Sequence, residues 1–325
     1  MTRVRDWLAR SLAAPEPRPL DGLGVDSPES RAGARWWRNA AVRGLVFIVV
    51  FMVMATGLTM AESVLPSPAQ SWVDAALELV SSLVAYACVV LVVEGRRRPF
   101  EIAPRRSPGL LAGMLLGGGA CVVIVWFLAM SGALLYLGVN HGFHWGLPLW
   151  QLGISSAISE EIIFRSMLYR LVESGVGTWG ALAVSSVLFG AVHLSNPDAT
   201  VWGAVAIALE AGVMFGALYT LTRSLWVVVG VHFAWNVMEG PVLGSVVSGS
   251  SSTADSWLIS RPAGPGWFSG GSFGIEGSVV TVILWGAVSA WLIVRIVREH
   301  KLIQPAWVRR RPTVTPRRAA TKVRD

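Results

Sequence analysis

Four polar side chains whose types suit hydrolysis lie within long apolar runs of the sequence: Glu160, His193, His232 and Asn236. An ionisable side chain in the bilayer interior costs about 2.5–3.5 kcal/mol on insertion scales, so such residues usually face a cavity and serve a function. A carboxylate and imidazoles can activate a water molecule, and an amide can donate a hydrogen bond to an oxyanion. The set therefore predicts hydrolytic chemistry within a membrane.

The first motif contains two adjacent carboxylates, Glu160 and Glu161, followed by Arg165. Successive residues of a helix are about 100° apart, so the two carboxylates cannot both point squarely into one cavity. Arg165 follows Glu161 by four residues, which is the favourable spacing for an ion pair on a helix. We therefore expect Glu161 to pair with Arg165 and Glu160 to remain for chemistry. The alternative is that both carboxylates only hydrogen-bond to neighbouring helices.

The other two motifs have the same four-residue spacing, Phe189 with His193 and His232 with Asn236. Each pair lies on one face of its helix, and alone each pair also fits packing or hydrogen bonding between helices. At about 1.5 Å rise per residue, Glu160, His193 and His232 reach a similar depth, between the cytoplasmic side and the midplane of the membrane. This common depth favours a single site.

The composition indicates a membrane protein. Hydrophobic residues make up 53% of the chain, charged residues only 14%, and the mean hydropathy is +0.56. The 16 Trp residues suit the aromatic belts at the two membrane surfaces. The formal charge of +7 comes from Arg residues at the ends of apolar runs, where they set topology, so we expect a lipid bilayer and no nucleic acid as a partner.

The apolar runs predict an all-α fold, a polytopic membrane bundle of about eight transmembrane helices. The expected spans are 44–61, 73–93, 109–139, 147–171, 179–194, 201–222, 225–242 and 277–297. Of the 27 Lys and Arg residues, only Arg261 lies in a segment on the side opposite to the others. The positive-inside rule makes the Arg-rich side cytoplasmic, and an even number of spans then places both termini there. We expect a multi-pass protein of the plasma (inner) membrane.

The chain divides into three parts at the sequence level. Residues 1–43 are expected to form a partly disordered cytoplasmic tail, and 298–325 a basic cytoplasmic tail. Residues 44–297 form the transmembrane unit, with the three motifs in a core at 147–242. The segment 243–276 is expected to face outward, and its Gly and Ser content is typical of a flexible connector.

Three motifs in order on separate spans, Glu160-Glu161-x-x-x-Arg165, Phe189-x-x-x-His193 and His232-x-x-x-Asn236, resemble the CPBP intramembrane protease family. That family includes the type II CAAX prenyl endopeptidases and their bacterial relatives. The resemblance implies an eight-helix bundle that cleaves a peptide bond of a membrane-associated or lipidated protein or peptide. Carried onto matching positions, it marks as catalytic Glu160, His193, His232 and Asn236. It gives Glu161, Arg165 and Phe189 supporting places.

Two mechanisms are compatible with these residues. Without a metal, Glu160 and His193 polarise the water, while His232 and Asn236 donate to the oxyanion. In the alternative, Glu160, His193 and His232 bind zinc and leave one position open for water. Asn is a poor zinc ligand and a good amide donor, and the chain has no HExxH, so no cofactor is favoured.

Two other functions remain open from the sequence. A catalytically silent scaffold or immunity-type protein of the same fold is the main alternative, although such a protein has no need of the intact motif set. A transporter with a proton relay is less favoured, because no inverted repeat is visible. Outside the motifs, Glu210 is expected to be a buried hydrogen-bond partner. Glu239 lies on the same helix face as His232 and is a candidate for orienting it.

Overall fold

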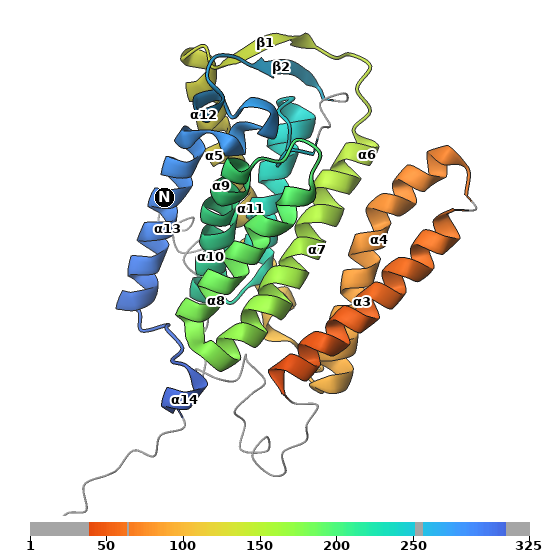
Figure 1. Cartoon of the computed structure of the whole chain (residues 1–325), viewed down its shortest axis with the longest axis vertical. Helices are drawn as coiled ribbons and strands as arrows, with labels where there is room; N and C mark the ends of the chain where they lie inside the picture. Colours follow the sequence, from red (N-terminus) through yellow and green to blue (C-terminus); the bar gives the residue numbers. More distant parts are fainter. Residues whose placement is uncertain (1–38, 64, 251–255, 310–325) are drawn as a thin grey trace, which may run out of the picture.

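The computed structural model describes residues 39–63, 65–250 and 256–309, which form a helical bundle with a two-stranded sheet at one end (Figure 1). In this part of the chain, six helical stretches are long and apolar enough to cross a membrane. They are Ala40–Glu62, Ala69–Val93, Pro104–Met130, Gly146–Ser195, Val201–Thr222 and Val279–Arg298. The predicted all-α, polytopic bundle is confirmed.

The stretch Gly146–Ser195 is two arms joined at Gly177, where the backbone leaves the helical region with φ of 80°. Its first arm contains α6 (Gly146–Pro148) and α7 (Ala157–Glu161), and the second arm is most of α8 (Arg170–Val192). The two arms run in opposite directions (Figure 1). A Cβ atom at Gly177 would lie 2.6 Å from the carbonyl oxygen of Ile303, so only glycine fits this turn. The arms correspond to the expected spans 147–171 and 179–194.

The helix α11 (Leu225–Val237) lies inside the bundle and continues as a π-helical turn, Met238–Val242 (Figure 1). It is shorter than the other spans and is not among the six stretches, although it matches the expected span 225–242. The chain reaches it from α9 (Val201–Ile207) and α10 (Met214–Thr222). The count of eight spans and the cytoplasmic position of the termini therefore stay predictions.

The helix α5 (Pro108–Met130) packs against α11 through a seam of glycines, backbone against backbone. A Cβ atom at Gly117 would lie 2.3 Å from the carbonyl oxygen of Val231. From the other helix, a Cβ atom at Gly230 would lie 2.2 Å from the carbonyl oxygen of Leu110. Close approach through small residues is the usual way for membrane helices to gain packing energy, and here it fixes the helix that carries His232 and Asn236.

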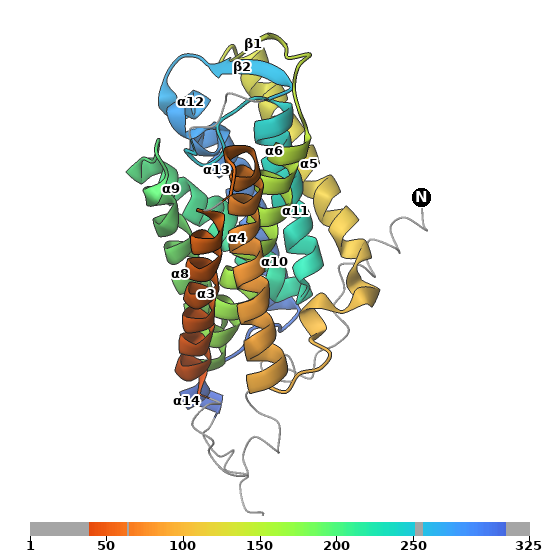
Figure 2. The same ribbon diagram turned by 90° about the vertical axis from the view of Figure 1, so that its right-hand side faces the viewer.

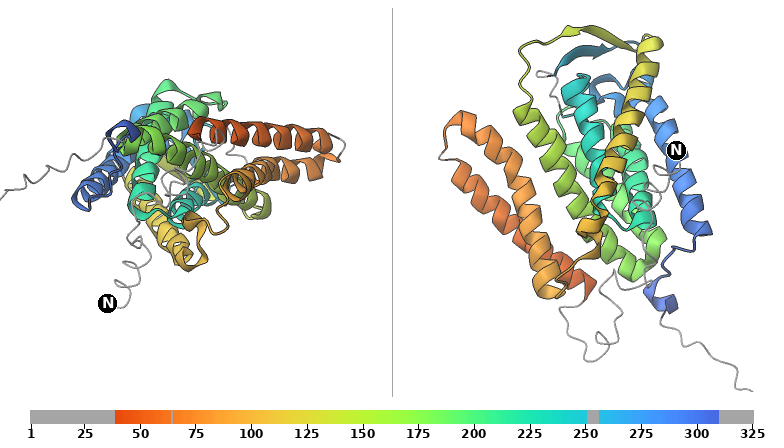
Figure 3. Two further views of the ribbon diagram at one scale, coloured as in Figure 1. Left: turned by 90° about the horizontal axis from the view of Figure 1, so that it is seen from below. Right: turned by 180° about the vertical axis from the view of Figure 1, so that it is seen from behind.

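Two helices on one flank, α3 (Ala40–Glu62) and α4 (Ser67–Ala87), lie side by side (Figure 2, Figure 3). The buried carboxylate of Glu94, in the turn that follows α4, joins α3 and α4 to the rest of the bundle. It accepts hydrogen bonds from Arg43 of α3 at 2.9 Å and from Arg170 of α8 at 2.7 Å. The first helix among the described residues begins at Ala40, so the end of the predicted 1–43 tail is helical.

Two expectations outside the core are wrong. The predicted span 109–139 is too long, because α5 ends at Met130 and Gly132 turns the chain with φ of 75°. Residues Leu134–Val139 instead form β1, whose backbone pairs in antiparallel fashion with β2 (Leu258–Pro262). The described part of the expected flexible connector is also structured, since it contains β2 and α12 (Gly266–Ser269) and buries Glu276.

The remaining parts of the predicted tails, 1–38 and 310–325, lie outside the described residues, as does the tip of the outer segment at 251–255. The described start of the C-terminal segment returns to the bundle. There the amide of Thr178 donates to the carbonyl of Ile303 at 3.0 Å. The last described helix is α14 (Ala306–Arg309).

Candidate active site

The centre of the site is the carboxylate of Glu161. Its Oε1 atom accepts hydrogen bonds from Nη1 of Arg165 and Nδ1 of His232, each at 3.0 Å. Glu161 and Arg165 are fully buried, so the ion pair is shielded from water. The predicted pairing of Glu161 with Arg165 is present. The structure adds that the same oxygen holds the imidazole of His232.

The guanidinium of Arg165 lies among aromatic rings. Its carbon is 4.4 Å from the ring centroid of Phe189, 5.0 Å from that of Phe215 and 5.9 Å from that of Phe164. Aromatic faces attract a cation most strongly when both are removed from water. Nη2 donates to the carbonyl of Ala211 at 2.9 Å. Phe189 thus supports the site by holding Arg165, a role that its position four residues before His193 does not reveal.

The neighbouring carboxylate, Glu160, is in a different environment. Its Oε1 accepts a hydrogen bond from Oγ of Ser156 at 2.7 Å, and its side chain is 19% exposed. Its Oε2 lies 4.0 Å from Nε2 of His232, and no donor among the described residues reaches it. If Nδ1 of His232 carries the proton donated to Glu161, Nε2 is an acceptor that faces Glu160. The two atoms form an open polar site of the size that one water molecule can bridge.

The last motif residue, Asn236, lies one turn after His232 on α11. Its Nδ2 donates to the carbonyl of Leu152 at 3.1 Å and makes a longer contact, 3.4 Å, with Oγ of Ser156. Ser156 therefore lies between Asn236 and Glu160, because it contacts both. The amide of Asn236 is thus held next to the carboxylate of Glu160, and its two contacts are with protein oxygen atoms.

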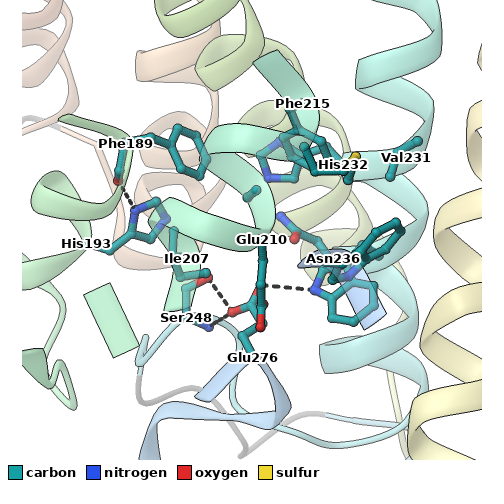
Figure 4. Close-up of a pocket in the computed structure, with 14 residues that line it drawn as sticks. Phe189, His193, Ile207, Glu210, Phe215, Val231, His232, Asn236, Ser248 and Glu276 are labelled. Atoms are coloured by element: carbon teal, nitrogen blue, oxygen red, sulfur yellow. Dashed lines mark hydrogen bonds between the residues drawn. The ribbon is translucent and has the colours of Figure 1, made fainter. Parts of the chain in front are cut away.

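The second motif histidine occupies another side of the site. Nδ1 of His193 is 2.7 Å from the carbonyl oxygen of Phe189, which makes Nδ1 the protonated atom and Nε2 an acceptor. His193, His232 and Asn236 line one cavity (Figure 4). Glu160 is not among the residues that line it. The structure therefore brings together three of the four expected residues in the cavity, with Glu160 on the other side of His232.

Two carboxylates that the motifs do not include also line this cavity, Glu210 and Glu276 (Figure 4). Glu276 accepts hydrogen bonds from Nε1 of Trp235 at 2.9 Å, from the amide of Ser248 at 2.7 Å and from Oγ of Ser248 at 2.6 Å. Burial raises the pKa of Glu276, and the hydrogen bonds from Ser248 act in the opposite direction. Glu276 and Ser248 were missed in the sequence because they belong to a Gly/Ser-rich segment that resembles a linker.

The expectations for the two additional intramembrane carboxylates need correction. Glu210 is buried as expected, but no hydrogen-bond partner for its Oε1 exists among the described residues. Glu239 does not orient His232, since both ring nitrogens of His232 face Glu160 and Glu161 instead. Both carboxylates owe their placement to contacts between distant segments, which the helical spacing does not reveal.

The backbone around the site departs repeatedly from the α-helix. π-Helical stretches lie directly before or after the segments that carry site residues, at Leu149–Ser156, Ile162–Tyr169, Ala208–Val213 and Met238–Val242. A π-helical turn contains an extra residue and redirects the side chains next to it, and such turns are frequent at functional sites. No sequence signal marked these turns.

The described residues do not gather a zinc set. Within them, no three His, Cys, Asp or Glu side chains are placed to hold one metal ion. In the alternative set of Glu160, His193 and His232, the two histidines line the cavity but Glu160 does not, and Oε2 of Glu160 lies 4.0 Å from Nε2 of His232. The three side chains therefore do not converge on one point as a His₂Glu shell requires.

Part of this chain matches a family model. No curated protein matches this chain. The segment that matches, residues 142–238, contains all three motifs and the helices that carry them, and it covers less than half of the chain. Together with the six apolar helices, it identifies a multi-pass integral membrane protein. Residues 142–238 match the family model of the type II CAAX prenyl endopeptidases, described as Rce1-like, and the resemblance in the motifs is thereby confirmed.

Proposed function

We propose that this protein is an intramembrane endopeptidase that hydrolyses a peptide bond of a membrane-associated or lipidated protein. The observation that carries the proposal is the unpartnered Oε2 of Glu160, 4.0 Å from Nε2 of His232. A carboxylate with a free oxygen and an imidazole held in place by a second carboxylate together form a base that can activate water. The family match supports a CAAX-type protease at the level of the family.

In the proposed reaction, a water molecule bridges Glu160 and His232. Glu160 Oε2 takes one proton, the hydroxide attacks the scissile carbonyl carbon, and Glu160 later returns the proton to the leaving nitrogen. Glu161 fixes the tautomer and orientation of His232 through the 3.0 Å contact. This division gives the adjacent carboxylates separate tasks, one chemical and one orienting.

Asn236 is the proposed donor to the oxyanion. One N–H of its amide is committed to Leu152, while the other makes only the 3.4 Å contact with Ser156 and can turn to a better acceptor. One such donor contributes about 3 kcal/mol in enzymes where it was removed. His193, with Nε2 free to accept, is placed to receive a hydrogen bond from water or from the N–H of the substrate. The proposed catalytic set is thus Glu160, His193, His232 and Asn236, with no cofactor.

The substrate class follows from the position of the site within apolar helices. A peptide reaches these residues from the bilayer or its surface, which favours a lipidated chain end or the terminus of a membrane protein. The lipid bilayer is then both the setting and a partner, and we propose the plasma (inner) membrane as the location.

The test uses the purified protein reconstituted in liposomes. A farnesylated peptide ending in a CAAX sequence and the same peptide without the lipid are incubated with the protein, and products are identified by mass spectrometry. We expect cleavage by the wild type, with Glu160→Gln slower by about 10²–10⁴. Glu299→Gln, at an ion pair outside the site, is the matched control and should cleave normally.

Two results would contradict the proposal. Cleavage by Glu160→Gln at the wild-type rate would remove Glu160 from the chemistry. A wild type that cleaves neither peptide, and whose presence creates no new protein termini in cell membranes, would favour the silent scaffold.

A further inference from the structure

The cavity beside His232 has a composition that hydrolysis does not require. We name it the carboxylate pocket and define it by two carboxylates and four aromatic side chains: Glu210, Glu276, Phe189, Phe215, Trp235 and Trp285. The carboxylates come from the π-helical turn Ala208–Val213 and from the turn before α13 (Val279–Arg298). Figure 4 shows both acidic side chains reaching the same part of the cavity.

The two carboxylates differ in how well they are satisfied. Glu276 has three donors, from Trp235 and Ser248. Glu210 is only 3% exposed, and no donor among the described residues reaches its Oε1. A buried oxygen without a donor is costly, more so if it is charged, and such groups call for a ligand or water. Glu210 therefore has unused capacity to accept hydrogen bonds inside the pocket.

The charge of the pocket favours a cationic ligand. No Lys or Arg is among the described residues that line it. Two carboxylates that share a region of low dielectric cannot both be ionised cheaply unless a positive charge lies between them. The lining itself offers only the two imidazoles as positive groups, so a positively charged ligand would favour ionisation of both carboxylates.

The walls favour an organic cation rather than a metal ion. Trp235 and Trp285 meet edge to face, with ring centroids 5.6 Å apart, and the rings of Phe215 and His232 are tilted against each other with centroids 5.2 Å apart. Aromatic rings attract ammonium groups, whereas a metal needs three or more ligating atoms that the described residues do not gather. Carboxylates with aromatic walls are the surroundings that an ammonium group prefers.

The free acceptor in the pocket narrows the class of ligand further. A primary ammonium group has three N–H donors, one of which can satisfy Oε1 of Glu210. A quaternary ammonium group has no N–H and cannot donate to this oxygen. The unsatisfied oxygen therefore favours a primary amine.

We propose that the carboxylate pocket binds a primary ammonium group and that, resting on the proposed peptidase function, this group is the new N terminus of the C-terminal cleavage product. His193, His232 and Asn236 line the same cavity, so the pocket adjoins the proposed reaction centre, and the new N terminus enters it after its nitrogen has taken the proton from Glu160. Glu210 accepts from the ammonium, and Glu276 and the aromatic rings complete its surroundings.

Binding to the full-length protein in detergent tests the proposal without turnover. The probes are an apolar tripeptide, Val-Val-Leu, with a free or an acetylated N terminus, and methylammonium or tetramethylammonium chloride at equal ionic strength. The thermal unfolding midpoint is followed against probe concentration. We expect the free-amine tripeptide to bind at least tenfold more tightly than the acetylated one, about 1.4 kcal/mol. Methylammonium should stabilise the protein, and tetramethylammonium should not.

Variants locate the bound group. Glu210→Gln should abolish the preference for the free amine, and Glu299→Gln, the same change at an ion pair outside the pocket, should keep it. If Glu210→Gln does not fold, Glu210→Asp is used instead. It retains the carboxylate on a shorter side chain, farther from the ligand, and should weaken the preference.

The proposal is overturned if both tripeptides bind equally, if tetramethylammonium stabilises as well as methylammonium, or if the preference is undiminished in the Glu210 variants. A wild type that binds methylammonium but cleaves no substrate would leave the pocket standing and remove the proposed function.

Discussion

Replacing Glu161 by Gln should destabilise the protein far more than the same change one residue earlier. Glu161 and Arg165 are fully buried and 3.0 Å apart, so the neutral amide leaves the guanidinium with uncharged acceptors and aromatic faces but no negative partner. Removing one partner of a buried pair costs about 3–5 kcal/mol. Glu160→Gln is the control: its side chain is 19% exposed, and the amide keeps an acceptor for Ser156, so the loss should be about 1 kcal/mol or less.

A second substitution separates the effect of the buried charge on stability from the role of Glu161 in catalysis. Combining Glu161→Gln with Arg165→Met removes the unpaired charge, and the apolar side chain suits the rings of Phe164, Phe189 and Phe215. Much of the lost stability should return, because a buried ion pair replaced by apolar groups is often nearly neutral. Cleavage should not return, because Nδ1 of His232 has lost its charged acceptor.

The assay is reversible unfolding in mixed detergent micelles, with turnover measured on the same preparations. A coupling energy near zero between the Glu161 and Arg165 changes would refute the reasoning. Equal stability of the Glu161→Gln and Glu160→Gln variants would refute it as well. Either result would mean that the ion pair of Glu161 and Arg165 is not shielded from water.

Other predictions concern packing, catalysis, cofactor and topology. Gly117→Ala should lower stability by about 1–3 kcal/mol, whereas Gly119→Ala, where a Cβ atom meets nothing within 4 Å, should be neutral or stabilising in the same unfolding assay. Asn236→Ala should lower kcat by about 10²–10³ with an unchanged unfolding midpoint; an unchanged kcat would remove it as an oxyanion donor. Activity should persist in a strong chelator, and a loss restored by zinc would favour the metal mechanism. In a protein without other cysteines, an impermeant thiol reagent added outside cells should label position 267 and not 97; the reverse pattern contradicts the topology.

The part of the site that depends on neighbours in sequence could be predicted. Glu161 and Arg165 are four residues apart on one helix, so their pairing follows from helix geometry, as does the different environment of Glu160. The contact between His232 and Glu161 joins two helices, and nothing in the sequence predicted it; the residue expected to orient His232 was Glu239.

The parts that sequence reasoning missed depend on long-range contacts. Glu276 lies in a Gly-rich segment, and it becomes a buried group only because Trp235 and Ser248 reach it from other segments. Residues 134–139 are apolar enough for a span, yet their backbone pairs with β2, a strand whose position depends on the tertiary fold. Hydropathy measures neither kind of contact.

The glycine seam between α5 and α11 has a mechanical consequence. Side chains between two helices act as a compressible layer that lets the helices slide or tilt by small amounts. At Gly117 and Gly230 this layer is absent, because backbone atoms meet backbone atoms directly. The two helices therefore move as one stiff unit, and His232 and Asn236 keep their height relative to α5. Any motion that admits a peptide must come from helices outside this pair.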